Sequence, residues 1–77
     1  MTIGADQIRE LIVAALPDAH VDCVDMTGTS DHWQVEVVST EFEGKRILAQ
    51  HRLVKAALHA QIMDGTIHAL TLTTRTP

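Results

Sequence analysis

Histidine is the residue type in this sequence that is best suited to chemistry. Five histidines occur among 77 residues, whereas cysteine occurs once, at Cys23. Imidazole nitrogens bind metal ions and respond to pH near neutrality, but a single cysteine cannot form a disulfide within the chain. Two of the histidines, His32 and His68, lie where predicted strands begin. Their chemistry therefore depends on how the strands are arranged.

The last predicted strand starts beside His68. Residues from 67 onward alternate in polarity and are rich in β-branched side chains, which is typical of a strand. Leu70 and Leu72 share the parity of His68, so this parity predicts the core face. We therefore expect His68 to be half buried at the start of the strand, held in place and still accessible.

Apolar periodicity and turn residues predict the order helix, strand, strand, helix, strand. The residue ranges are 5–16, 20–26, 33–39, 46–63 and 67 onward. Pro17 ends the first helix, and residues 27–31 have the composition of a turn. Phe42 is the expected anchor of the connector 40–44. The apolar stripe of the long helix is Ile47, Val54, Leu58 and Ile62, widened by Leu53 and Ala57.

These elements predict one α/β (α+β) domain with a three-stranded mixed sheet and helices on one face. The long helix has about 17 residues and spans roughly 25 Å, enough to return along a strand. A strand, a returning helix and a further strand in one sheet run up, down and up. The second and third strands therefore begin at the same end, and His32 and His68 are expected at one edge of the sheet.

Charge and size narrow the classes of function. Six basic and ten acidic residues give a net charge of −4, which argues against tight nucleic-acid binding because phosphates must be neutralised by Lys and Arg. A chain this short has a thin core with no room for a deep substrate cavity. We expect a binding module and not an enzyme. The local concentration of positive charge is Lys45, Arg46, Arg52 and Lys55.

Cellular location is predicted from three features. The lone Cys23 fits a reducing compartment. The longest apolar run, residues 11–16, is far shorter than the roughly 20 residues that span a bilayer. Residues 1–6 lack the basic and apolar regions of a signal peptide. We expect a cytoplasmic protein without a membrane partner.

Five segments of the chain carry short motifs in order: residues 14–17 (AALP), 31–35 (DHWQV), 42–44 (FEG), 50–54 (QHRLV) and 67–70 (IHAL), the last followed by Thr76-Pro77. Together they resemble the motifs of the BolA-like protein family. Residues 67–70 with Thr76-Pro77 resemble its C-terminal signature, residues 50–54 look like its helical HRxV segment, and residues 31–35 look like its SHFxV segment. The resemblance covers nearly the whole chain in order, and His32 places it with the histidine-loop members.

The resemblance implies a fold and a function. The fold is αββαβ, related to the class II KH fold. The function is iron–sulfur cluster handling with a monothiol glutaredoxin of the CGFS type. The partner's cysteine and a glutathione thiol would bind one side of a 2Fe–2S cluster, and His68 and His32 would bind the other. Two histidines do not complete a metal site, so no cofactor is expected in the isolated protein.

The candidate residues also have simpler interpretations. Without the family resemblance, His68 would be interpreted as a histidine at the edge of the core that forms a hydrogen bond to a backbone carbonyl. His32 would be interpreted as an exposed loop residue. The basic side chains of the long helix have two interpretations. They form either a solvated face, made of Arg46, Arg52 and Lys55, or, together with His51, a docking patch for glutathione or an acidic partner. The side chain of His51 itself is expected to be partly buried and to serve packing. His20 and His59 are expected to be solvated, Trp33 and Cys23 to be core residues.

We interpret the chain as an adaptor that binds a monothiol glutaredoxin, and two alternative functions compete with this interpretation. One is a DNA-binding transcriptional regulator of stress response and cell morphology that uses the basic helix. No glycine pair is spaced as GxxG, because the glycines are at 4, 28, 44 and 65, so the KH clamp on nucleic acid is missing. The other is a weak homodimer that acts as an interaction domain without metal.

Overall fold

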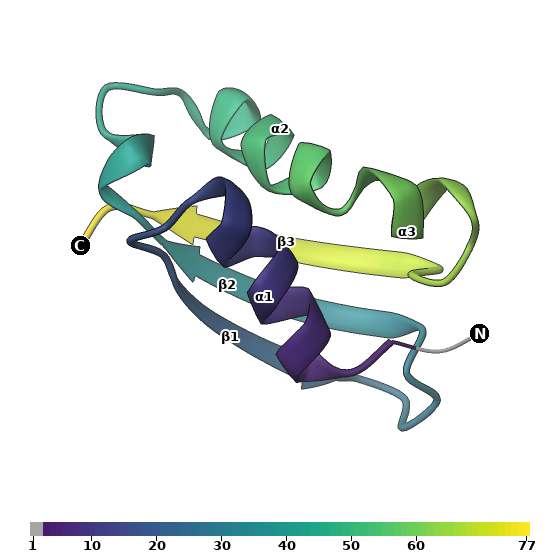
Figure 1. The fold of residues 1–77 in the computed structure, drawn as a ribbon. Helices are drawn as coiled ribbons and strands as arrows, with labels where there is room; N and C mark the ends of the chain where they lie inside the picture. The colour runs from purple at the N-terminus through teal and green to yellow at the C-terminus, as the bar shows by residue number, and fades with distance from the viewer. Residues whose placement is uncertain (1–2) are drawn as a thin grey trace.

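The computed structural model describes residues 3–77 (Figure 1). Met1 and Thr2, which belong to the N-terminal segment expected to lack a signal peptide, lie outside the described residues. The elements are α1 (Ala5–Ala15), β1 (His20–Asp25), β2 (His32–Val38), the 3-10 helix η1 (Thr40–Phe42), α2 (Ile47–Ala57), α3 (His59–Met63) and β3 (Ala69–Arg75). Within residues 3–77 no helix has the length and apolar character needed to cross a membrane.

The sheet has the predicted mixed topology. Its strand order is β1-β2-β3, with β1 antiparallel and β3 parallel to the central β2. The helices lie on one face of this sheet (Figure 1). His32 is opposite Ala69 in the β2–β3 register. Both strands therefore begin at the same end of the sheet, as predicted from the helix that connects them.

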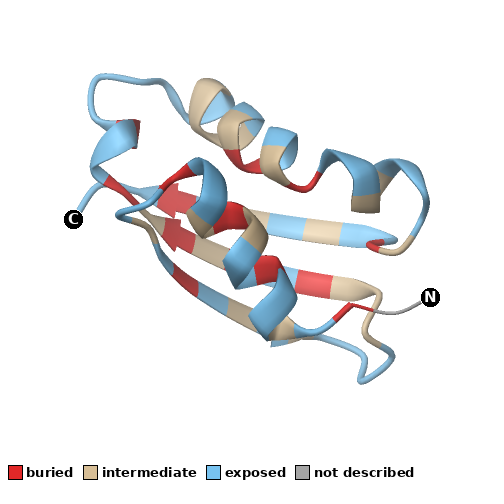
Figure 2. Cartoon of the chain, in the orientation of Figure 1, coloured by how far each residue is buried: buried red, intermediate tan, exposed pale blue. Residues whose placement is uncertain are grey.

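The core lies between the helices and the sheet (Figure 2). Alternation along β2 buries Val35, Val37 and Trp33, of which Trp33 was expected to be a core residue. Helix α1 contributes Ile8 and Ile12, both fully buried, because their spacing of four places them on one helical face. The remaining buried apolar residues are Ile3, Leu16, Val21, Phe42, Val54, Leu58 and Ile67.

The predicted long helix is divided, which corrects the continuous span 46–63. Leu58 has φ −107° and ψ 13°, outside helical values, and separates α2 from α3. Its N–H is shared between the carbonyls of Val54 and Lys55, at 3.3 and 3.2 Å. The apolar spacing continues through the fully buried Leu58 into α3. Periodicity reports which side chains are apolar, not where the helix axis turns, so it does not reveal the break.

The expectation that Ile47 lies in the core stripe is wrong. Its side chain is 59% exposed. Ile47 is the first residue of α2, and the buried part of that helix lies further along, at Val54. Leu53 and Ala57 do pack partly against the core, as predicted.

The start of β3 also differs from the expectation. The strand begins at Ala69, with Ile67 buried at 3% exposure and His68 exposed, the reverse of the predicted parity. The backbone N–H groups of His68 and Ala69 both donate to the carbonyl of Asp31, at 2.7 and 3.1 Å. Two successive donors on one acceptor break the alternation. From Leu70 onward the even positions face the core, as predicted.

Candidate metal centre

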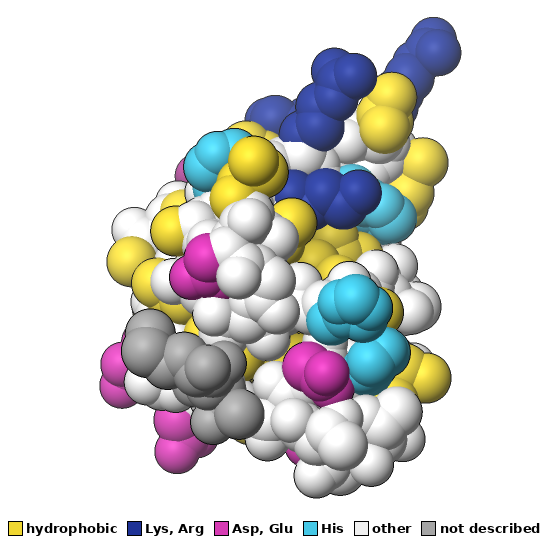
Figure 3. Space-filling model, turned by 90° about the vertical axis from the view of Figure 1, so that its right-hand side faces the viewer, with side chains coloured by type: hydrophobic (Ala, Val, Ile, Leu, Met, Phe, Trp, Pro, Cys, Tyr) yellow, Lys and Arg dark blue, Asp and Glu magenta, His cyan; other side chains and the backbone are white. Residues whose placement is uncertain are grey.

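The two histidines predicted at one sheet edge lie next to each other. His32 is the first residue of β2, and His68 directly precedes β3. Their ring centroids are 5.2 Å apart and the rings are tilted by 60°. On the face drawn in Figure 3, histidine side chains gather below a group of Lys and Arg side chains. The structure thus brings together residues 32 and 68 at the starts of two different strands.

The ring spacing fits two ligands on one metal. An imidazole nitrogen lies about 2.0–2.1 Å from a tetrahedral metal and roughly 1.1 Å from its own ring centre, which places two such ring centres on the order of 5 Å apart. The observed centroid distance of 5.2 Å agrees with this value. Within residues 3–77 no group of three or more His, Cys, Asp and Glu side chains is arranged to hold a metal ion. The pair can therefore supply part of a coordination sphere.

His32 is oriented by its neighbour Asp31. The Oδ1 atom of Asp31 lies 2.8 Å from Nδ1 of His32, and the two side chains are 40% and 37% exposed. The hydroxyl of Thr29 donates to the same carboxylate oxygen. These two hydrogen bonds, that of Thr29 first, hold the pKa of Asp31 below its usual value. Asp31 is thus a carboxylate that accepts hydrogen bonds at neutral pH.

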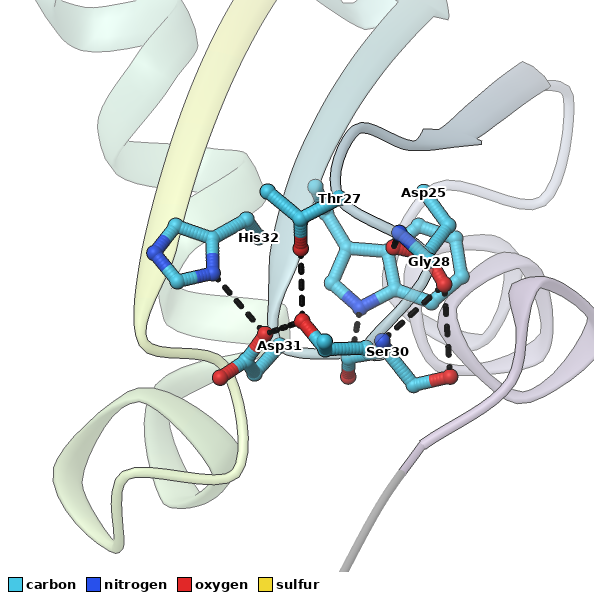
Figure 4. A network of polar contacts seen from close by, with 8 residues as sticks. Asp25, Thr27, Gly28, Ser30, Asp31 and His32 are labelled. Carbon is cyan, nitrogen blue, oxygen red and sulfur yellow. Dashed lines mark hydrogen bonds and ion pairs between the residues drawn. The ribbon is translucent and has the colours of Figure 1, made fainter.

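The loop before His32 is ordered by its own hydrogen bonds (Figure 4). The carboxylate of Asp25 accepts the N–H groups of Gly28 and Ser30, at 3.0 and 2.9 Å. This arrangement holds Ser30 at φ 63°, a left-handed conformation that non-glycine residues seldom adopt. The carbonyl of Ser30 accepts the indole N–H of Trp33 at 3.0 Å. Because Trp33 is buried, the loop is tied to the core just where His32 begins β2.

The other predicted site residues lie on α2 and, in the case of Arg46, at its N-cap. Arg46, Arg52 and Lys55 are exposed. His51 is half buried, and within the described part of the chain its Nε2 atom is enclosed without a hydrogen-bond partner. This burial agrees with the packing role expected for His51, whereas the three cations are accessible to solvent.

The remaining candidates lie apart from the pair. His20 and His59 are exposed, as expected. Cys23 is half buried on the core side of β1, and burial raises the pKa of its thiol. Sequence reasoning missed Asp31. The available signal was an acidic residue directly before a candidate ligand, but only the folded loop shows that the carboxylate turns towards the imidazole.

Comparison with known proteins agrees with this architecture. Residues 9–77 match the family described as BolA-like protein. The chain belongs to the BolA family. Protein BOLA2 of Arabidopsis thaliana is 38% identical over 71 residues, which cover 91% of this chain and 74% of that relative.

Solved BolA structures share the fold. BolA1 from Arabidopsis thaliana matches with a TM-score of 0.84 at 28% identity, covering 100% of this chain and 95% of that one. A BolA protein homologue from Coxiella burnetii matches with a TM-score of 0.78 at 33% identity, covering 99% and 94%. The predicted family and the predicted small α+β domain are both confirmed.

Proposed function

We propose that this BolA-family protein is an adaptor that binds a monothiol glutaredoxin of the CGFS type and co-ligates a 2Fe–2S cluster with it. The adaptor acts in iron–sulfur cluster trafficking or iron regulation and catalyses no reaction itself. The observation that supports this best is the pair His32 and His68, whose ring centroids are 5.2 Å apart at one sheet edge.

The composition of the site explains why a partner is needed. A 2Fe–2S cluster takes four ligands, and imidazoles can replace two thiolates on one iron, which raises the reduction potential. His32 and His68 are accessible ligands of this kind. The remaining two ligands are then the cysteine of the glutaredoxin and a glutathione thiol. The cluster is shared cargo, so the isolated protein binds it weakly.

The exposed side of α2 fits the same partner. Arg46, Arg52 and Lys55 are exposed cations, which complement the carboxylates of glutathione or an acidic protein surface. Ile47 and Leu48 lie between Arg46 and Arg52 in the sequence and are 59% and 60% exposed, so apolar and basic groups share one surface. We expect association to weaken as salt concentration rises, because these charges are solvated.

Anaerobic reconstitution tests the proposal. The protein is mixed with a CGFS glutaredoxin, glutathione, iron and sulfide, and the products are separated by size and weighed by native mass spectrometry. We expect a heterodimer with one 2Fe–2S cluster and one glutathione. His59→Ala, which changes an exposed histidine of α3, serves as the matched control and should behave as the wild type. If all of the cluster stays in glutaredoxin homodimers despite an excess of this protein, the proposal is wrong.

A further inference from the structure

Asp31 contacts the segments of both histidines. Its carboxylate oxygen Oδ1 lies 2.8 Å from Nδ1 of His32. Its backbone carbonyl accepts the N–H groups of His68 and Ala69, at 2.7 and 3.1 Å. One residue thus joins the start of β2 to the start of β3. The side chain acts on one ligand and the main chain on the other.

The contact with the carboxylate decides which nitrogen of His32 carries hydrogen. An ionised carboxylate is an acceptor only, so the hydrogen between the two residues belongs to Nδ1. A neutral imidazole with hydrogen on Nδ1 has its lone pair on Nε2. A metal binds that lone pair, so Nε2 is the atom of His32 that is ready to coordinate. Figure 4 shows the Asp31 carboxylate facing one edge of the His32 ring, with the other ring nitrogen turned away from it.

We propose that Asp31 is a positioning residue that holds His32 in the Nδ1–H tautomer with Nε2 presented to the metal, and that anchors His68 through its backbone carbonyl. This inference rests on the proposed function, because it assigns a role at the same cluster site. A carboxylate behind a histidine ligand fixes the ring and its tautomer, and removing such a group costs about 10- to 100-fold in metal affinity.

Asp31→Asn separates the side chain's role from that of the main chain. The backbone carbonyl is unchanged, so the contacts with His68 and Ala69 remain. The amide can turn its NH2 group towards Nδ1, which favours hydrogen on Nε2. The lone pair is then on Nδ1, and Nε2 can no longer bind the metal. Asp25→Asn is the matched control, because Asp25 shapes the same loop through Gly28 and Ser30 and makes no hydrogen bond to His32.

The first measurement uses the protein alone. Nitrogen-15 NMR of the histidine ring, at a pH where His32 is neutral, distinguishes the two tautomers without any metal. We expect the Nδ1–H form to dominate in the wild type and in Asp25→Asn, and the Nε2–H form to gain population in Asp31→Asn. A wild-type His32 that is mainly in the Nε2–H form overturns the inference, because the carboxylate would then not set the tautomer.

The second measurement follows cluster loss from the reconstituted heterodimer. We expect Asp31→Asn to lose the cluster about 10- to 100-fold faster than the wild type, and Asp25→Asn to change the rate much less. Equal acceleration in both variants would show that Asp31 acts only by shaping the loop, which contradicts the inference. If the wild type forms no cluster-bearing heterodimer, the proposed function fails, and the tautomer measurement still decides separately whether Asp31 positions His32.

Discussion

Alanine substitutions at the neighbouring residues Ile67 and His68 should have very different effects on the stability of the fold. Ile67 is 3% exposed and belongs to the core, so Ile67→Ala leaves a cavity. Such a change lowers the free energy of unfolding by about 2–4 kcal/mol, the lower part of the range for buried aliphatic residues because this site lies near the surface. A domain of this size is stable by about 4–12 kcal/mol in total. The loss is therefore a large part of the stability.

His68→Ala should leave the fold intact. The side chain of His68 is exposed, and its structural contact is the backbone N–H to the Asp31 carbonyl at 2.7 Å, which alanine retains. Surface substitutions of this kind change the free energy of unfolding by less than about 0.5 kcal/mol. That corresponds to a melting temperature within about 4 °C of the wild type.

Urea unfolding followed by the fluorescence of Trp33, the only tryptophan, measures both variants in one assay. Trp33 is 4% exposed in the folded protein, so its emission changes strongly when the core opens. A loss of more than about 1 kcal/mol in His68→Ala would exceed what an exposed side chain contributes. Such a loss would refute the view that His68 serves ligand binding and not stability.

Three further predictions concern other parts of the molecule. Hydrogen bonds from Thr40, first, and from Ser39 lower the pKa of Asp18 from 3.8 to about 2. Between these pH values the unfolded chain binds more protons than the folded one, so the free energy of unfolding falls as the pH drops from about 4 to 2. Asp18→Asn should flatten this part of the plot of unfolding free energy against pH, and parallel plots for the variant and the wild type would contradict the prediction. Burial raises the pKa of Cys23, so iodoacetamide should alkylate the folded protein at least about tenfold more slowly than the urea-unfolded protein, and equal rates would contradict the burial. With a net charge of −4, the isolated domain should bind promoter-length duplex DNA only weakly in fluorescence anisotropy at physiological salt, and nanomolar affinity would favour the transcriptional regulator instead.

The topology could be predicted because it follows from chain connectivity. A helix long enough to return along a strand forces β2 and β3 to begin at the same end, and this alone places His32 and His68 together. The core face of β2 could likewise be read from the alternation of Trp33, Val35 and Val37. These inferences need only local pattern and the right-handed, short connections that folds use.

The exposure of His68 could not be predicted, because it depends on a contact between residues far apart in the sequence. The Asp31 carbonyl accepts two successive N–H groups and shifts the alternation by one residue. The role of the Asp31 side chain could not be predicted for a different reason. Neighbouring side chains on a strand point to opposite faces, and Asp31 meets the imidazole of His32 only because it lies in the loop before β2.

The central claim is that His32 and His68 bind the shared cluster. Visible circular dichroism of the reconstituted heterodimer tests it most directly, because replacing thiolate by imidazole on one iron alters the electronic transitions of the cluster. We expect the wild type and His59→Ala to give one common spectrum that differs from the glutaredoxin homodimer. His68→Ala should remove most of that difference, and His32→Ala should give a heterodimer that loses its cluster faster. A wild-type spectrum and a wild-type rate of cluster loss in His68→Ala would contradict the claim.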